Sequence, residues 1–102
     1  MRDKIYLECI FGDCKGETFE LHTGVNKIGR GYQMDVCLSD DVQVTRDNHC
    51  SIVLDLESGV IKLVPSNGSI TYFNSTLLTT SVEVTESDVI RIGRNEIVLR
   101  KE

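Results

Sequence analysis

The chain has 102 residues, with 40% hydrophobic residues and a formal net charge of −5. This length suffices for one compact domain with one core and is too short for two, so we expect a single domain over residues 1–102. The negative charge and the scattered Lys and Arg residues argue against binding of nucleic acid. No apolar run is long enough for a membrane span or a signal peptide. We therefore expect a cytoplasmic protein with no membrane contact.

Short runs rich in β-branched and apolar residues recur along the whole chain and predict about eleven strands. The expected strands lie near 4–10, 17–21, 25–29, 36–38, 50–55, 60–64, 70–73, 76–78, 82–84, 89–92 and 96–100. Turn-forming residues separate them, and several strands alternate apolar with polar residues, as Ile90 and Ile92 do around Arg91. This pattern predicts an all-β sandwich of two twisted, mostly antiparallel sheets.

The longest segment without a strand pattern covers residues 39–49. Loops of this length inside a compact domain are usually functional or disordered. Thr45 and Arg46 lie in this segment, and Arg30 directly follows the expected strand 25–29. Guanidinium groups and hydroxyls on rigid strands are the donors that a phosphate group prefers. The sequence therefore predicts a phosphate-binding site where these loops meet.

Four cysteines stand at positions 9, 14, 37 and 50. They are compatible with two disulfides, but without an export signal we expect reduced thiols. The paired C-x-x-C spacing of zinc sites is absent, so no metal is expected. An enzyme with Cys50 as nucleophile and His49 as base is the weakest alternative, because adjacent strand residues point to opposite faces. No Gly-rich nucleotide loop is present, and we expect no catalytic residue and no cofactor.

The phosphate-binding candidates belong to a longer pattern. Its parts are Gly29-Arg30, Asp35-Val36-Cys37-Leu38, Thr45-Arg46 followed by His49, Asn67-Gly68, and Asp88-Val89-Ile90-Arg91-Ile92-Gly93. In this order they closely resemble the forkhead-associated (FHA) domain, whose motifs read G-R, D-[IV]-x-L, S-R-x-H, N-G and a later I-G. The resemblance covers roughly residues 4–100. It implies an SMAD/FHA-like β-sandwich that binds phosphothreonine peptides.

The resemblance implies a role for each matching residue of the binding loops. Arg30 matches the arginine that contacts the phosphate and the peptide, and Thr45 matches a serine whose hydroxyl donates to a phosphate oxygen. Arg46 matches a second phosphate contact, and Asn67 matches an asparagine that bonds the main chain of the ligand. Ser69 matches no residue of the family motif, and we expect it to contact the peptide beside the phosphothreonine from its loop position only.

Gly29, His49 and Gly68 are expected to support these loops rather than to touch the ligand. The chain departs from the family pattern at one point, because Asp47 and Asn48 separate Arg46 from His49 where the motif has one residue. Either Arg46 or His49 is therefore expected to leave its family position.

The expected function is phosphothreonine-dependent binding that recruits phosphorylated partners in kinase signalling. The partner would be a phosphothreonine-containing protein or peptide, such as the substrate of a Ser/Thr kinase. The alternative is a phosphate-independent interaction or assembly module on the same fold, which the extra residue before His49 favours.

Overall fold

A computed structural model describes residues 4–102, and the first three residues of the expected domain 1–102 lie outside the described residues. The described chain contains eleven strands and no helix, which confirms the predicted all-β sandwich. The strands are β1 Ile5–Phe11, β2 Thr18–Glu20, β3 Gly24–Gly29, β4 Val36–Cys37, β5 Cys50–Leu54, β6 Ile61–Pro65, β7 Thr71–Phe73, β8 Thr76–Leu77, β9 Val82–Glu83, β10 Val89–Ile92 and β11 Asn95–Lys101. Within residues 4–102, accordingly, no helix is long and apolar enough to cross a membrane.

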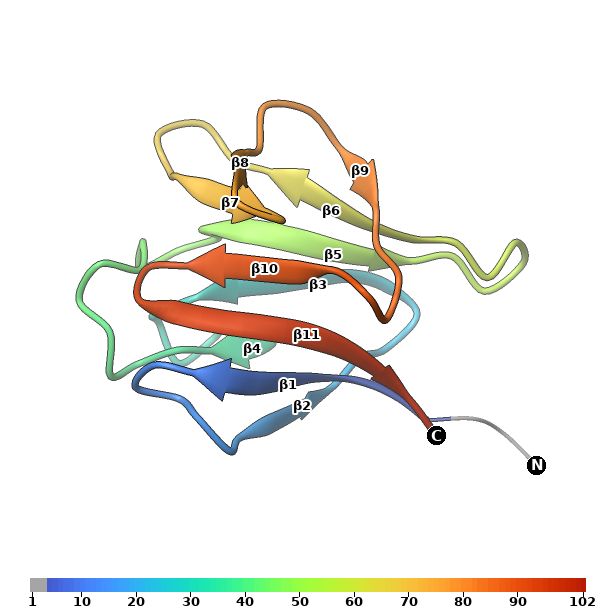
Figure 1. Cartoon of the computed structure of the whole chain (residues 1–102), viewed down its shortest axis with the longest axis horizontal. Coiled ribbons are helices and arrows are strands. Elements are labelled where there is room, and N and C mark those ends of the chain that lie inside the picture. Colours follow the sequence, from blue (N-terminus) through green and yellow to red (C-terminus); the bar gives the residue numbers. More distant parts are fainter. Residues whose placement is uncertain (1–3) are drawn as a thin grey trace.

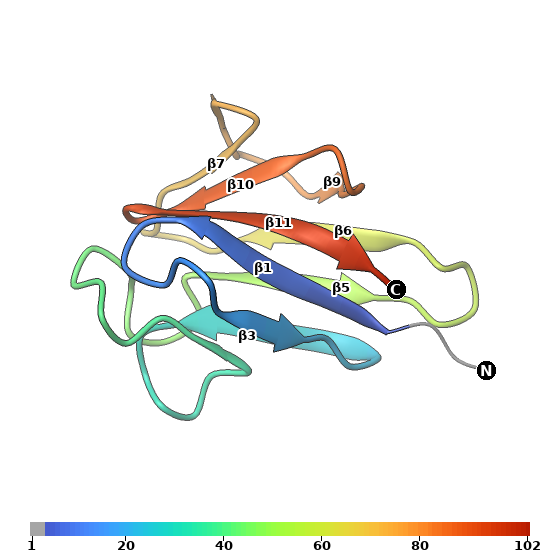
Figure 2. The same cartoon turned by 60° about the horizontal axis from the view of Figure 1, so that its bottom comes forward.

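The strands form two sheets that lie face to face (Figures 1 and 2). One sheet has six strands in the order β2-β1-β11-β10-β7-β8, and the other has five in the order β4-β3-β5-β6-β9. All described pairs are antiparallel except β3 with β4, which run parallel. Because β1 pairs with β11, the first and last strands are neighbours in the six-stranded sheet.

The core fills the space between the two sheets. Ile90 and Ile92 of β10 are fully buried while Arg91 between them is exposed, as the alternation predicts. From the five-stranded sheet, Ile52 of β5 and Leu63 of β6 are also fully buried. Side chains of both sheets belong to one hydrophobic cluster. The sandwich is therefore held by a single core that both sheets share.

Loops from both sheets gather at one end of the sandwich. The β4–β5 loop (residues 38–49, green in Figure 1) lies at this end together with the β10–β11 turn and the β1–β2 connection. The β6–β7 loop (residues 66–70) is tied to the same end, because His49 Nε2 bonds the Ile70 carbonyl oxygen at 2.8 Å. The residues predicted to bind phosphate are carried by these loops and by the β3–β4 connection.

Cys9 and Cys14 form a disulfide, so the expectation of four reduced thiols is wrong for this pair. A β-bulge follows Cys9 in β1, and the chain then turns back toward β2. This turn brings the two Cα atoms to 5.7 Å, within the range that a disulfide spans. Cys37 and Cys50 are free thiols, as expected.

Candidate functional site

Arg30 follows the last residue of β3 and is held by the β4–β5 loop. Its backbone N–H donates to the Thr45 carbonyl oxygen at 3.0 Å. Its side-chain Nε donates to the Val44 carbonyl oxygen at 3.1 Å, which orients the guanidinium. Among the described residues, no group accepts a hydrogen bond from its two terminal η nitrogens. Those nitrogens form a planar pair of donors suited to a phosphate or carboxylate group.

Gly29 lets the β4–β5 loop approach β3 closely. A Cβ atom at this position would lie 2.7 Å from the Arg46 carbonyl oxygen, closer than real Cβ contacts allow. The same carbonyl oxygen accepts a hydrogen bond from the Gly31 N–H at 2.8 Å. The backbone of residues 45–46 is therefore fixed beside residues 30–31 by two hydrogen bonds and one close approach.

Thr45 and Ser69 meet although they come from different loops. The Thr45 Oγ1 and Ser69 Oγ atoms are 2.6 Å apart, at a solvent-exposed position. Each hydroxyl carries one proton, and their mutual hydrogen bond uses only one of the two. The second proton is free to donate to an oxygen of a ligand.

His49 connects the loops that carry this hydroxyl pair. Its Nδ1 accepts a hydrogen bond from the Thr45 N–H at 2.9 Å, and its Nε2 therefore carries the proton that is donated to the Ile70 carbonyl oxygen. The side chain is buried. A neutral imidazole with the proton on Nε2 thus fixes the spacing of the β4–β5 and β6–β7 loops. His49 thus remains a candidate for supporting the loops, and these two hydrogen bonds are consistent with that prediction.

Asn48 takes up the extra residue of the β4–β5 loop. Its φ angle is 52°, in the left-handed region that asparagine tolerates better than most residues. Its Oδ1 accepts a hydrogen bond from the Ser51 hydroxyl at 2.9 Å, which holds this conformation. His49 keeps its bonds to both loops despite the longer sequence before it.

The structure does not draw Arg46 and Asn67 into the same network. Both are exposed, and their side chains make no hydrogen bond or ion pair within residues 4–102. Asn67 lies at the turn between β6 and β7, where Gly68 has a φ of 83° that favours glycine. Gly68 thus allows the backbone conformation of this turn. Arg46 and Asn67 remain candidates for phosphopeptide binding by their position alone.

An open groove of about 1010 Å³ extends from Thr45 and Ser69 along β7 and β10. Tyr72 and Arg91 line it. Neither was predicted as a site residue. The alternation in β10 indicates that Arg91 faces outward, but nothing in the sequence shows that this face adjoins the β4–β5 loop.

Asp35 fixes the end of the β3–β4 connection opposite Arg30. Its Oδ2 accepts a hydrogen bond from the Lys27 N–H at 2.8 Å, and its Oδ1 lies 3.1 Å from His22 Nε2. The bond from the Lys27 backbone is the main reason why the pKa of Asp35 lies below its ordinary value, and His22 adds to it. This carboxylate is therefore a structural anchor.

No cluster of three or more His, Cys, Asp or Glu residues that could hold a metal ion occurs in the part of the chain that the structure describes. An arginine and two hydroxyls lie on neighbouring loops at one end of a β-sandwich, and Arg30 is joined to the loop of Thr45 through backbone atoms. This combination defines the class of domain that presents a preformed anion-binding surface on loops.

Comparison with known proteins gives the family. The FHA domain model matches residues 26–93, more than half of the chain. The chain therefore belongs to the FHA domain family. No curated protein sequence matches it.

Several solved structures have the same fold. An FHA domain from a study of phosphothreonine-dependent FHA domain interactions is 32% identical, with a TM-score of 0.80 and 95% of each chain covered. The FhaA FHA domain, complexed with the intracellular domain of Rv3910, is also 32% identical, with a TM-score of 0.79, covering 94% of this chain and 99% of that one. The yeast Dun1 FHA domain, in complex with a doubly phosphorylated peptide, is 20% identical with a TM-score of 0.79, covering 96% of this chain and 74% of that one.

Proposed function

We propose that this domain binds a phosphothreonine-containing protein or peptide and recruits phosphorylated partners in kinase signalling. The observation that carries the proposal is the arrangement of Arg30 beside the β4–β5 loop, with the Thr45–Ser69 hydroxyl pair held by His49. It is supported by relatives with 32% identity, one of them studied for phosphothreonine-dependent interactions.

Each site residue has a role in this proposal. The η nitrogens of Arg30 bind two phosphate oxygens, and the free proton of the Thr45–Ser69 pair is donated to a third. Arg46 supplies a second cation near the phosphate, and the Asn67 amide bonds the main chain of the peptide. None of these steps makes or breaks a covalent bond.

Local charges must provide the attraction. The domain carries a net charge of −5, whereas a phosphothreonine brings about −1.5 to −2 charges. Exposed charges further apart than about 8 Å are largely screened at physiological salt. Each charge-assisted hydrogen bond contributes about 1.5–3 kcal/mol, so a few of them, less the cost of ordering the peptide, give about −8 kcal/mol. This corresponds to affinity near the micromolar range.

The candidate nucleophile of the enzyme alternative is unsuited to catalysis. Burial raises the pKa of the Cys50 thiol to about 12, so it stays protonated at neutral pH. Both nitrogens of His49 are occupied by Thr45 and Ile70, so no ring nitrogen remains to accept a proton from Cys50. We infer that the domain acts as a binding module and is not an enzyme.

Binding of a phosphothreonine peptide and of its unphosphorylated twin, measured by isothermal titration calorimetry, tests the proposal. The phosphorylated peptide is expected to bind and the twin to show no binding. Arg30→Ala should weaken binding of the phosphopeptide by about 2 kcal/mol, which is about a 30-fold rise in the dissociation constant, because it removes charge-assisted hydrogen bonds.

Lys62→Ala is a matched control, since it also removes one positive charge but from an exposed position on β6. Its phosphopeptide affinity should stay within twofold of the unchanged domain. Equal affinity for both peptides, or an unchanged affinity after Arg30→Ala, would contradict the proposal. Equal affinity would instead favour a phosphate-independent interaction module.

A further inference from the structure

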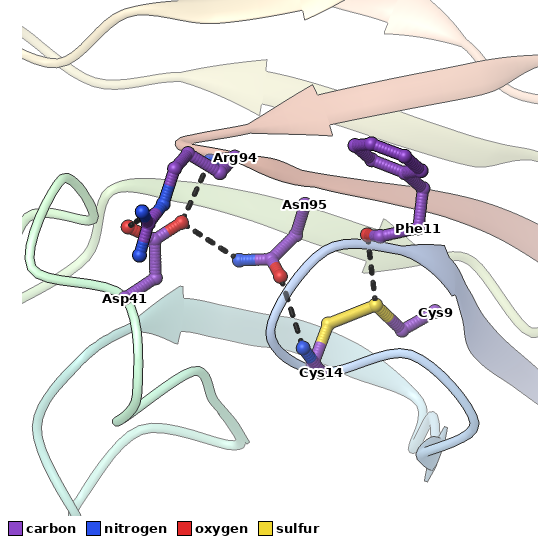
Figure 3. Close-up of a disulfide and its surroundings, with 6 residues drawn as sticks. All are labelled: Cys9, Phe11, Cys14, Asp41, Arg94 and Asn95. Atoms are coloured by element: carbon purple, nitrogen blue, oxygen red, sulfur yellow. Dashed lines mark hydrogen bonds and ion pairs between the residues drawn. A yellow bond between two sulfur atoms is a disulfide. The ribbon is translucent and has the colours of Figure 1, made fainter.

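The disulfide closes a small loop, here called the disulfide loop (residues 9–14), that packs against the β10–β11 turn. The Cys14 N–H donates to Asn95 Oδ1 at 3.1 Å, in a buried position. Beside it, Arg94 donates through a terminal nitrogen to Asp13 Oδ2 at 2.7 Å. Figure 3 shows the Asn95 side chain between the disulfide and Asp41. Two residues of the disulfide loop thus contact Arg94 of the β10–β11 turn and Asn95, the first residue of β11.

Asp41 connects the same turn to the β4–β5 loop. Its side chain is 1% exposed, and its Oδ2 accepts hydrogen bonds from the Arg94 N–H at 2.6 Å and from Asn95 Nδ2 at 3.0 Å. The Gln43 N–H donates to Oδ1 at 2.9 Å. A buried carboxylate is stable only with such donors. Two of these three donors belong to Arg94 and Asn95, the residues that the disulfide loop contacts.

The hydrogen bonds continue from Asp41 to the phosphate-binding arginine. The Asp41 carbonyl oxygen accepts from the Val44 N–H at 3.1 Å, and the Val44 carbonyl oxygen accepts from Arg30 Nε at 3.1 Å. An unbroken series of contacts therefore runs from Cys14 through Asn95, Asp41 and Val44 to Arg30. Cys14 lies in the connection between β1 and β2 of the six-stranded sheet, and Arg30 lies in the connection between β3 and β4 of the five-stranded sheet. The loops therefore join the two sheets at this end.

We propose that the Cys9–Cys14 disulfide positions the β4–β5 loop and Arg30 through Asn95 and Asp41, so that reducing it lowers the affinity for phosphothreonine. Asn95 and Asp41 are positioning residues in this view, because neither needs to touch the ligand. The predicted change in peptide affinity rests on the proposed function, because it can be measured only if the domain binds phosphothreonine. The structural part of the inference, the coupling of disulfide to Arg30, is independent of that function.

Reduction proceeds by thiol–disulfide exchange with a dithiol. Cys9 and Cys14 are buried, so the disulfide loop has to open before a thiolate of the dithiol can attack one of the two sulfurs. The S–S bond then breaks, and the second thiol releases the dithiol as its own disulfide. Two electrons and two protons end on Cys9 and Cys14. The reduced Cys9 thiol has an acceptor nearby, since its Sγ lies 3.4 Å from the Phe11 carbonyl oxygen.

The consequence of reduction is greater freedom for the disulfide loop. Without the covalent link, ordering residues 10–13 costs more conformational entropy, so the bonds of Asp13 and Cys14 to the β10–β11 turn weaken. Asn95 then loses the partner that fixes its amide, and Asp41 loses a well-placed donor.

The test compares oxidised protein with protein reduced by dithiothreitol, using fluorescence anisotropy of a labelled phosphothreonine peptide. Reduction should weaken binding at least about fivefold, the lower end of typical coupling between sites, at unchanged stoichiometry. The double variant Cys9→Ser/Cys14→Ser should bind like the reduced protein and should not respond to dithiothreitol. Asn95→Ala keeps the disulfide but interrupts the contacts, so it should also bind weakly and lose the response.

NMR of the protein without peptide gives a second measurement that does not depend on the variants folding. On reduction, the Arg30 Nε–H and the Val44 amide proton should exchange faster with solvent, because both are donors in the described contacts. Equal affinities within twofold in the two redox states, or exchange rates that do not change on reduction, would overturn the inference. If the oxidised protein fails to distinguish phosphorylated from unphosphorylated peptide, the proposed function fails, and the exchange rates alone still decide the coupling.

Discussion

At the scale of single residues, His49 decides whether the two hydroxyls of the site can meet. Its two ring nitrogens have opposite roles, since Nδ1 accepts from Thr45 and Nε2 donates to Ile70. Only a neutral imidazole in one tautomer satisfies both bonds. The extra residue in the loop does not disturb them, because Asn48 adopts a left-handed conformation beside it.

Replacing His49 tests this role. His49→Ala should lower the free energy of unfolding by about 2 kcal/mol or more, because it removes two hydrogen bonds and leaves a buried acceptor or donor unpaired. The same variant should weaken binding of the phosphothreonine peptide, because the spacing between Thr45 and Ser69 is no longer fixed. In His49→Asn, the Oδ1 atom can replace Nδ1, but the side chain is too short to reach Ile70. The stability and the peptide affinity of this variant should therefore lie between those of the unchanged domain and those of His49→Ala. Urea denaturation with peptide titration measures both effects, and full affinity in His49→Ala would contradict the assigned role.

At the scale of elements, His22 and Asp35 tie the β2–β3 turn to the start of β4. The bond to the Thr23 carbonyl oxygen is the main reason why the pKa of His22 lies above its ordinary value of 6.5, and Asp35 adds to it. A raised histidine pKa stabilises the fold below about pH 6.5, and this contribution is lost as the pH rises through the raised value. Because the pKa of Asp35 is lowered, its ionised carboxylate stabilises the fold above about pH 3.8, its ordinary pKa. This contribution is lost as the pH falls through the lowered value.

The two contributions overlap in mildly acidic solution. His22→Gln should therefore lower the urea midpoint more at about pH 5.5 than at about pH 8, where wild-type His22 is largely neutral. In an NMR titration, Asp35→Asn should move the pKa of His22 back toward its ordinary value. A His22→Gln effect that is the same at both pH values would show that the pair does not contribute through its charge.

At the scale of the whole molecule, the sequence predicts the strands better than their contacts. Alternation around Arg91 and the turn residues between strands are local signals, so all eleven strands could be predicted. Arg30 could be placed at the end of a strand, and Thr45 in the loop between two strands. The Cys9–Cys14 disulfide could not, because it depends on a β-bulge and a turn that four intervening residues do not reveal. Asp41 and Asn95 were missed because they meet only in the fold, 54 positions apart.

The shared core predicts that residues 4–102 unfold as one unit. Leu63 on β6 and Leu99 on β11 belong to different sheets, yet both are fully buried in the same cluster. Leu63→Ala and Leu99→Ala should each lower the free energy of unfolding by about 2–5 kcal/mol through lost burial and the cavity left behind. Because each sheet covers the other, either variant should reduce amide hydrogen-exchange protection in both sheets and leave a single urea transition by circular dichroism. Two separate transitions, or a loss of protection confined to the mutated sheet, would show that the two sheets unfold independently. The contacts from Cys14 to Arg30 would then connect two parts of the molecule that a shared core does not hold together.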